Sequence, residues 1–239
     1  MNNRIPVLEI FGPTIQGEGM VIGRKTMFVR TAGCDYSCTW CDSAFTWDGS
    51  TKEEIRQMET EEVLAELKQI GGEYFDHVTI SGGNPALFTS VNELIDLLHH
   101  HHIEVALETQ GSRWQDWFLK VDDLTISPKP PSSGMETDWS VLHNIINRLK
   151  ENNISLKVVI FSRGDLAYAE KVHQRFPGIP FYLQVGNDDI IEKNPDQLAL
   201  YLLEKYHWLI DQVVASKTLN QVHVLPQLHA LVWGNKRGV

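Results

Sequence analysis

Three cysteines within eight residues are the most chemically distinctive feature of the chain, and they make up its whole cysteine content. Cys34, Cys38 and Cys41 follow the spacing C-x3-C-x2-C. A disulfide framework would instead spread an even number of cysteines along a secreted chain. We therefore expect reduced thiols that act together, because thiolates bind metals and clusters and perform redox exchange.

Three kinds of chemistry compete for this motif. A thiol–disulfide pair would use Cys38 and Cys41 and would leave Cys34 without a role. A structural zinc site needs four ligands, and the next histidine after the motif is His77. An iron–sulfur cluster held by three thiolates leaves one iron open to a further ligand. We favour the cluster, and the zinc and redox interpretations remain as alternatives.

The elements that must position these cysteines are readable as alternating short strands and helices. Apolar runs predict strands at 26–31, 77–81, 103–108, 124–127, 155–161, 180–185 and 222–225. Amphipathic stretches between most of them predict helices at 60–70, 91–98, 139–149, 166–176 and 197–213. About six alternations indicate an α/β fold with a parallel sheet covered by helices. Because a closed TIM barrel has eight units, we expect an open, partial (βα)6-type barrel.

Polar and glycine-rich segments follow several of the predicted strands. Cys34 follows the first strand, and 81–85 (SGGNP), 108–111 (ETQG), 127–130 (SPKP) and 184–187 (QVGN) follow later ones. In parallel α/β folds the working side chains lie at the C-terminal ends of the strands. We therefore expect these segments to meet the cysteines on one face of the molecule.

Length and composition set limits on the class of protein. The 239 residues are 42% hydrophobic and 22% charged, which suits one domain, residues 1–239, with a sizeable core. A net charge of -10 argues against a nucleic-acid partner. Apolar runs fall short of the roughly 18–20 residues that span a bilayer, and the first residues lack the apolar core of a signal peptide. We expect a cytoplasmic protein without a membrane partner.

Six segments carry a closer resemblance. The cysteine spacing is that of radical S-adenosylmethionine (SAM) enzymes. The surrounding sequence resembles the 7-carboxy-7-deazaguanine synthases, the radical SAM family of queuosine and 7-deazapurine biosynthesis. The segments that carry this likeness are GPTIQGEG (12–19), FVRTAGC (28–34), CDSAFTWDG (41–49), TISGGNPA (79–86), LETQG (107–111) and TISPKPPSS (125–133).

The resemblance implies a specific reaction. The enzyme would be a lyase that converts 6-carboxy-5,6,7,8-tetrahydropterin to 7-carboxy-7-deazaguanine and releases ammonia. A reduced [4Fe-4S] cluster would cleave SAM to a 5'-deoxyadenosyl radical, which would remove the hydrogen at C6 of the pterin. The family further implies Mg2+, an external electron donor of the flavodoxin type, a homodimer and a modified, compact radical SAM core.

The resemblance also assigns residues to the cofactors. Cys34, Cys38 and Cys41 would bind the cluster. The residues expected to contact SAM are Trp40, Cys41, Asp42, Gly83, Ser127, Pro128, Lys129, Gln184 and Asn187. This chain has Asn84 where the radical SAM superfamily usually has a glutamate, so the SAM ammonium would lose one charge-assisted hydrogen bond.

Substrate and magnesium are assigned in the same way. The expected substrate-binding residues are Ile15, Gln16, Gly17, Arg30 and Ser81. Arg30 lies in a predicted strand, where an unpaired guanidinium facing the interior would be costly, and a substrate carboxylate would satisfy it. Ser43 matches the position that offers a hydroxyl to Mg2+, an ion that prefers oxygen ligands. Glu108 either binds ribose hydroxyls or neutralises Lys129. The basic residues 235–239 either reach a substrate carboxylate or form a solvated tail, and we favour the solvated tail.

Two other functions remain open at this stage. A glycyl-radical activating enzyme would share the cluster but would need a groove for a partner chain. A non-catalytic iron–sulfur or zinc module would have no use for the glycine-rich segments at the strand ends.

Overall fold

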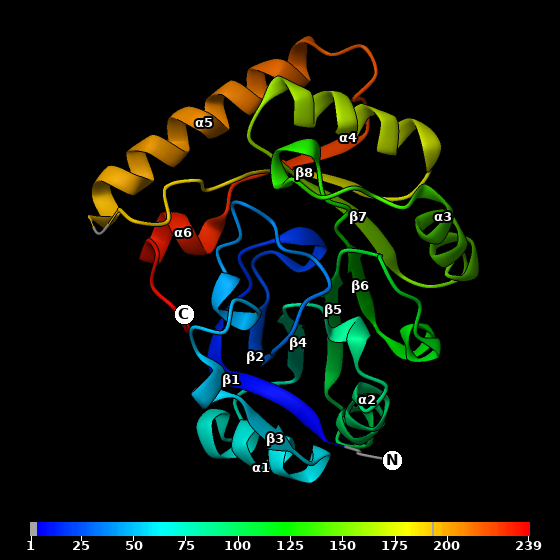
Figure 1. Cartoon of the computed structure of the whole chain (residues 1–239), viewed down its shortest axis with the longest axis vertical. Coiled ribbons are helices and arrows are strands. Elements are labelled where there is room, and N and C mark those ends of the chain that lie inside the picture. Colours follow the sequence, from blue (N-terminus) through cyan, green and yellow to red (C-terminus); the bar gives the residue numbers. More distant parts are fainter. Residues whose placement is uncertain (1–3, 193) are drawn as a thin grey trace.

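The computed structural model describes residues 4–192 and 194–239, which form one nine-stranded sheet with the order β3-β1-β2-β4-β5-β6-β7-β8-β9 (Figure 1). All neighbouring strands from β2 to β9 in this order are parallel, whereas β1 is antiparallel to both β2 and β3. The strand order is linear, so the sheet has two edges and stays open. Figure 1 shows that the sheet is curved. The strands are β1 (Ile5–Ile15), β2 (Lys25–Thr31), β3 (Arg56–Met58), β4 (His77–Gly82), β5 (Glu104–Thr109), β6 (Asp123–Ile126), β7 (Ile154–Ile160), β8 (Phe181–Val185) and β9 (Val222–Leu225).

Helices cover the outer face of this sheet. Figure 1 shows α1 to α5 along the outside of the curve, while the segment that follows β2 lies inside it. Strand β7 is buried at every position, because both of its faces are covered. The α-helices are α1 (Thr60–Gly71), α2 (Val91–His100), α3 (Trp139–Arg148), α4 (Arg163–Arg175), α5 (Pro195–Ala215) and α6 (Leu228–Trp233).

The partial-barrel fold and all seven predicted strands are confirmed. The predicted helices are confirmed too, with shifts of a few residues at their ends. Between β5 and β6, where the sequence predicts no helix, the chain crosses through the 3-10 helix η5 (Asp116–Lys120). Six crossovers therefore connect the seven parallel strands in the described part of the chain.

Strand β1 was not predicted, and its sequence explains why. Its eleven residues contain Pro6, Gly12 and Pro13, which argue against a strand in the middle of a sheet. The pairing with β2 is interrupted by register shifts between Val7 and Glu9 and between Phe11 and Thr14. Antiparallel pairing with β2 and β3 tolerates these interruptions, and β1 brings Glu9 and Phe11 beside β2. The short β3 and the C-terminal α6 were likewise not predicted.

The apolar faces of these elements form one large core between the sheet and the helices. No helix in the described ranges is both long enough and apolar enough to cross a bilayer.

His77, at the start of β4, is a neutral histidine within this core. It is fully buried, and its Nδ1 lies 2.8 Å from Thr26 Oγ1. Burial, together with the nearby positive charge of Arg24, lowers the pKa of His77 to about 4. The folded protein therefore resists protonation of a side chain that the unfolded chain protonates below about pH 6.5.

This histidine makes folding stability depend on pH. Between pH 6.5 and pH 4 the unfolded state binds more protons than the folded state, so the free energy of unfolding falls as pH decreases. We expect His77→Asn, which cannot titrate, to lose less stability than the wild type between pH 7 and pH 5. Urea unfolding at both pH values measures this, and parallel losses in the two proteins would contradict it.

Candidate active site

The C-terminal ends of the parallel strands surround a cavity of about 300 Å³. Its lining includes residues that follow β2, β4, β5, β6 and β8, and side chains from β7. Of the expected site residues, all except Pro128 and Gln184 line this cavity. The expectation that one face gathers the polar strand ends is therefore confirmed.

The three cysteines are free thiols on the wall of this cavity. Burial raises the pKa of Cys34 and Cys41 and raises that of Cys38 to about 11. A structural zinc ion needs four protein ligands, and these thiols supply three. An iron–sulfur cluster held by three thiolates keeps one iron open to a further ligand, which suits the three thiols of this loop.

The cysteine loop is attached on two sides. On one side, Thr39 N donates to Ser133 O at 3.0 Å, and Trp40 Nε1 donates to Ser132 Oγ at 3.0 Å. The Trp40 ring also packs against Phe161, with ring centroids 4.7 Å apart. These contacts attach the cysteine loop to the segment after β6 and to Phe161.

On the other side, two glycines form the seat of the cysteine loop. A Cβ added to Gly83 would lie 2.0 Å from the carbonyl oxygen of Gly33, and one added to Gly82 would lie 2.2 Å from that of Thr31. Gly83 N donates to Thr31 O at 3.1 Å. Only residues without a side chain allow this close backbone approach. The glycine-rich segment thus carries the cysteine loop as well as lining the cavity.

A buried ion-pair network lies below the cavity. Lys157 Nζ of β7 donates to Glu18 Oε2 at 2.5 Å and to both carboxylate oxygens of Glu108 at 3.1 Å. Burial alone would lower the pKa of Lys157 and raise that of Glu18, but their mutual attraction outweighs it and shifts both pKa values the other way. The suggestion that Glu108 neutralises Lys129 is wrong, because Glu108 pairs with Lys157. Lys129 Nζ instead donates to Ser127 Oγ at 3.3 Å.

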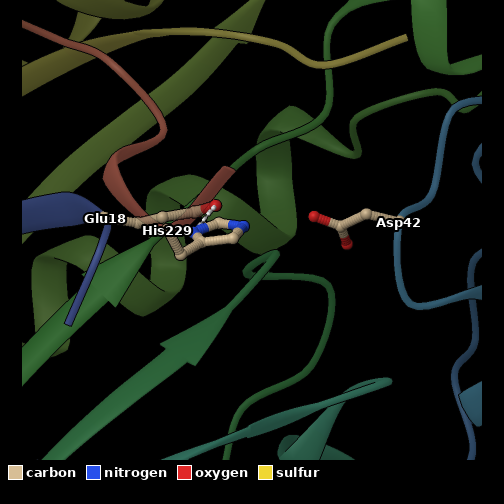
Figure 2. A group of neighbouring side chains, drawn as sticks. All are labelled: Glu18, Asp42 and His229. Carbon is tan, nitrogen blue, oxygen red and sulfur yellow. Dashed lines mark ion pairs between the residues drawn. The ribbon is translucent and has the colours of Figure 1, made fainter. Parts of the chain in front are cut away.

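Glu18 also belongs to a second group, with His229 and Asp42. Figure 2 shows Glu18 and His229 side by side, with Asp42 facing them from the segment after Cys41. Ligand atoms of all three lie within 4.8 Å of one another, so they could hold a metal ion. Ser43 Oγ donates to Asp42 Oδ1 at 2.9 Å, which places the expected magnesium ligand next to this group.

Arg30 is already paired. Its Nη1 lies 2.6 Å from Glu9 Oε1, so the premise of an unpaired guanidinium was wrong, although the side chain does line the cavity. The other carboxylate oxygen of Glu9, Oε2, accepts from Arg237 Nε at 2.7 Å, and Arg237 Nη2 donates to Glu54 at 2.9 Å. Both guanidinium groups stack on Phe45, at 5.4 and 4.4 Å from its centroid.

The C-terminal tail is therefore part of the site. Residues 234–239 line the cavity, which corrects the expectation of a solvated tail. Asn235 Oδ1 accepts from Asn187 Nδ2 at 2.8 Å and thereby connects the tail to the end of β8. The basic composition of the tail allowed the alternative of a contact with substrate, but only the fold shows that the tail lies at the cavity beside β1.

Gln184, in β8, is a buried amide with unused hydrogen-bonding atoms. It is fully buried, and neither Nε2 nor Oε1 has a partner among the described residues. Gln184 pairs in register with Val159, which lines the cavity. A buried amide without partners is costly, so this position fits a residue that a bound polar group would satisfy.

Sequence reasoning did not place Glu18, Lys157, His229 or Arg237 in the site. Two of them carried a signal. Glu18 stands within the TIQGEG segment, and Lys157 is the one charged residue in a strand that is otherwise apolar apart from Ser155. His229 carried none. For Arg237 there was only the basic composition of the tail, since only the folded chain brings the C-terminal segment back to β1.

Comparison with known proteins agrees with this geometry. Residues 28–162 match the model of the radical SAM superfamily. The chain is 62% identical over 237 residues to 7-carboxy-7-deazaguanine synthase of Bacillus cereus, covering 99% of this chain and all of the relative. It is 63% identical to the Bacillus subtilis enzyme of the same name over the full length of both. The chain belongs to the 7-carboxy-7-deazaguanine synthase family. It is thus a radical SAM lyase.

Solved structures support the fold of this radical SAM enzyme. A crystal structure of QueE from Escherichia coli superposes with a TM-score of 0.69 at 20% identity and covers 95% of both chains. Streptococcus suis SuiB bound to the precursor peptide SuiA gives a TM-score of 0.56 at 12% identity, covering 85% of this chain and 49% of SuiB. At these identities the likeness concerns the fold alone.

The glycine seat yields a direct test. Gly83→Ala forces a methyl group against the Gly33 carbonyl, so we expect the folded state to lose about 1–3 kcal/mol. We also expect the reconstituted protein to hold much less iron, because the loop that carries the cysteines must move. Gly164→Ala in α4 is the control, since its nearest neighbour lies 3.5 Å away. Equal iron content in the two variants would contradict a seat at Gly83.

Proposed function

We propose that this enzyme converts 6-carboxy-5,6,7,8-tetrahydropterin to 7-carboxy-7-deazaguanine with release of ammonia, in queuosine biosynthesis. The observation that carries the proposal is a single cavity in which three free thiols, glycine-rich strand ends, buried carboxylates and two arginines meet. A cavity of about 300 Å³ is within the size range of small-molecule binding sites. The full-length identity with relatives named for this product supports the same substrate.

Cys34, Cys38 and Cys41 would hold a [4Fe-4S] cluster, and the fourth iron would bind SAM. When bound, cluster and SAM supply the radical that removes hydrogen from C6 of the pterin. The three free thiols that line the cavity fit this group. Trp40, Asp42, Gly83, Ser127, Pro128, Lys129, Gln184 and Asn187 are the proposed SAM-binding residues.

The substrate would lie against Ile15, Gln16, Gly17, Arg30 and Ser81. Glu18 and Glu108 keep carboxylate oxygens beside the cavity, and such oxygens accept hydrogen bonds from the N–H groups of a pterin. Arg30 and Arg237 share Glu9, yet each guanidinium has five N–H donors. The donors that Glu9 leaves free can bind the substrate carboxylate.

Mg2+ would bind at Ser43, with Asp42 as the neighbouring carboxylate. Both offer the oxygen ligands that Mg2+ prefers, and substrate oxygens and water would complete the shell. We further propose a single domain over residues 1–239, a cytoplasmic homodimer and an external donor of the flavodoxin type. The acidic net charge is consistent with a protein that does not bind nucleic acid.

Anaerobic turnover tests the proposed reaction. We expect the reconstituted enzyme with dithionite, SAM, Mg2+ and the tetrahydropterin to form 7-carboxy-7-deazaguanine and ammonia. Mass spectrometry detects the deazaguanine product. Cys34→Ala should form neither this product nor 5'-deoxyadenosine, because one cluster ligand is missing. Deoxyadenosine without the deazaguanine in the wild type would overturn the substrate and keep the radical chemistry.

The tail makes a second prediction about substrate affinity. Arg237→Gln removes one guanidinium, so we expect KM for the tetrahydropterin to rise about tenfold, as for the loss of one charged hydrogen bond of roughly 1.4 kcal/mol. Lys217→Gln removes one positive charge at an exposed position outside the cavity and should leave KM unchanged. Steady-state kinetics with both variants measures the difference, and equal KM values would contradict it.

A further inference from the structure

The carboxylate of Asp35, between the first two cysteines, accepts three side-chain hydrogen bonds. Asn84 Nδ2 donates to its Oδ1 at 2.8 Å, and Gln110 Nε2 donates to the same oxygen at 2.6 Å. Ser112 Oγ donates to Oδ2 at 2.7 Å. The donors follow β4 and β5, so the four residues, which we call the Asp35 clamp, fasten the cysteine loop to two strand ends.

The orientation of the Asn84 amide is fixed by its other neighbours. Its Oδ1 accepts from Ala86 N at 3.2 Å and from Thr109 Oγ1 at 2.9 Å. Both partners donate here, so the oxygen must face them and Nδ2 must face Asp35. The second Nδ2 hydrogen points to Ser112 Oγ at 3.1 Å. Asn84 is therefore a fully satisfied amide that can only donate toward the cysteine loop.

The donors of the clamp are buried and its acceptor is exposed, so losing the contact costs the two sides unequally. Asn84 is fully buried and Gln110 is 6% exposed, whereas Asp35 is exposed. If the loop moved away, the carboxylate would find water, but the buried amides would lose their acceptor. An unpaired buried donor costs more than the hydrogen bond itself contributes. The buried amides thus penalise any loop position other than the one observed.

The clamp reaches a cysteine directly. Gln110 Nε2 lies 3.6 Å from Cys34 Sγ as well as 2.6 Å from the Asp35 carboxylate. The backbone of Asn84 is fixed to the same loop, because its N–H donates to Gly33 O at 2.8 Å. A change in Asp35 or Asn84 therefore acts on the position of Cys34.

We propose that Asp35 and Asn84 form a positioning pair that holds Cys34 ready for the cluster, with the charge on residue 35 and the amide on residue 84. Residue 84 must then be neutral, because an acidic side chain there would put a second carboxylate in contact with Asp35. Like charges at hydrogen-bond distance cannot both be accommodated in such a site. The pair supports the cluster chemistry of the proposed function, yet it acts in the protein before any cofactor binds.

An isosteric charge exchange tests the pair in the chain without cluster or SAM. Asn84→Asp should increase deuterium uptake of residues 33–40 and the rate of limited proteolysis within this segment on the order of tenfold, a typical coupling within one polar network. In the double variant D35N/N84D, residue 35 donates to residue 84 and the Gln110 amide turns round to accept. We expect this double variant to recover at least half of the loss. Asp35→Asn alone should have a smaller effect, because its amide oxygen still accepts from Asn84.

Two further variants keep the test decisive. Asn144→Asp, at an exposed position of α3, adds the same charge elsewhere and should change neither readout. Ser112→Ala buries no new charge and therefore tests the clamp even if Asn84→Asp fails to fold. It should give an intermediate increase in both readouts. The proposal would be overturned if deuterium uptake were equal in Asn84→Asp and Asn144→Asp. It would also be overturned if the double variant showed no recovery and Ser112→Ala left both readouts unchanged.

Iron content separates this inference from the proposed reaction. After anaerobic reconstitution at limiting iron, Asn84→Asp should bind several-fold less iron than the wild type, and the double variant should recover. Wild-type protein that shows this pattern but forms no deazaguanine would keep the positioning pair and remove the substrate assignment. Normal turnover with no coupling between residues 35 and 84 would do the reverse.

Discussion

The site depends on a lysine placed where the interior is least able to solvate it. Lys157 lies in the fully buried strand β7, and its charge is tolerated because Glu18 and Glu108 reach it from two other parts of the chain. Glu18 is held in turn by Gln227 and His229 from the C-terminal segment. A buried ion that loses its partners is strongly destabilising. The one charge in β7 therefore joins the N-terminal glycine-rich segment, β5 and the C-terminal helix around one cavity.

Backbone contacts and side-chain hydrogen bonds fix different aspects of the position of the cysteine loop. Gly82 and Gly83 let the backbone of the loop approach the end of β4, and this contact sets the distance. The Asp35 clamp then sets the rotation of the loop through polar side chains, which have directional preferences. On its opposite side the segment around Ser132 and Ser133 closes the contact. Three supports from different strands leave a short loop with little freedom before any cluster is present.

The parallel strands and most of the candidate site residues could be predicted from the sequence, because both leave local sequence patterns. Apolar runs mark buried strands, and the segments after them mark the face where chemistry occurs. Strand β1 escaped prediction because Pro6 and Pro13 contradict the usual pattern, and only pairing with β2 shows that they are tolerated. The partner of Arg30 and the place of Arg237 were also out of reach. Both depend on contacts between β1 and the tail, which are separated by most of the chain.

An open barrel keeps two sheet edges that a closed one would not have, and unpaired edge groups can recruit strands from other molecules. In this protein the two outermost strands are short, since β3 has three residues and β9 has four. At the β9 edge, Tyr206 donates to Val224 O at 2.9 Å and occupies one acceptor of the strand. At the other edge β3 pairs only with Ile5–Val7 of the eleven-residue β1, so the openness of the barrel leaves most of β1 without a neighbouring strand on that side.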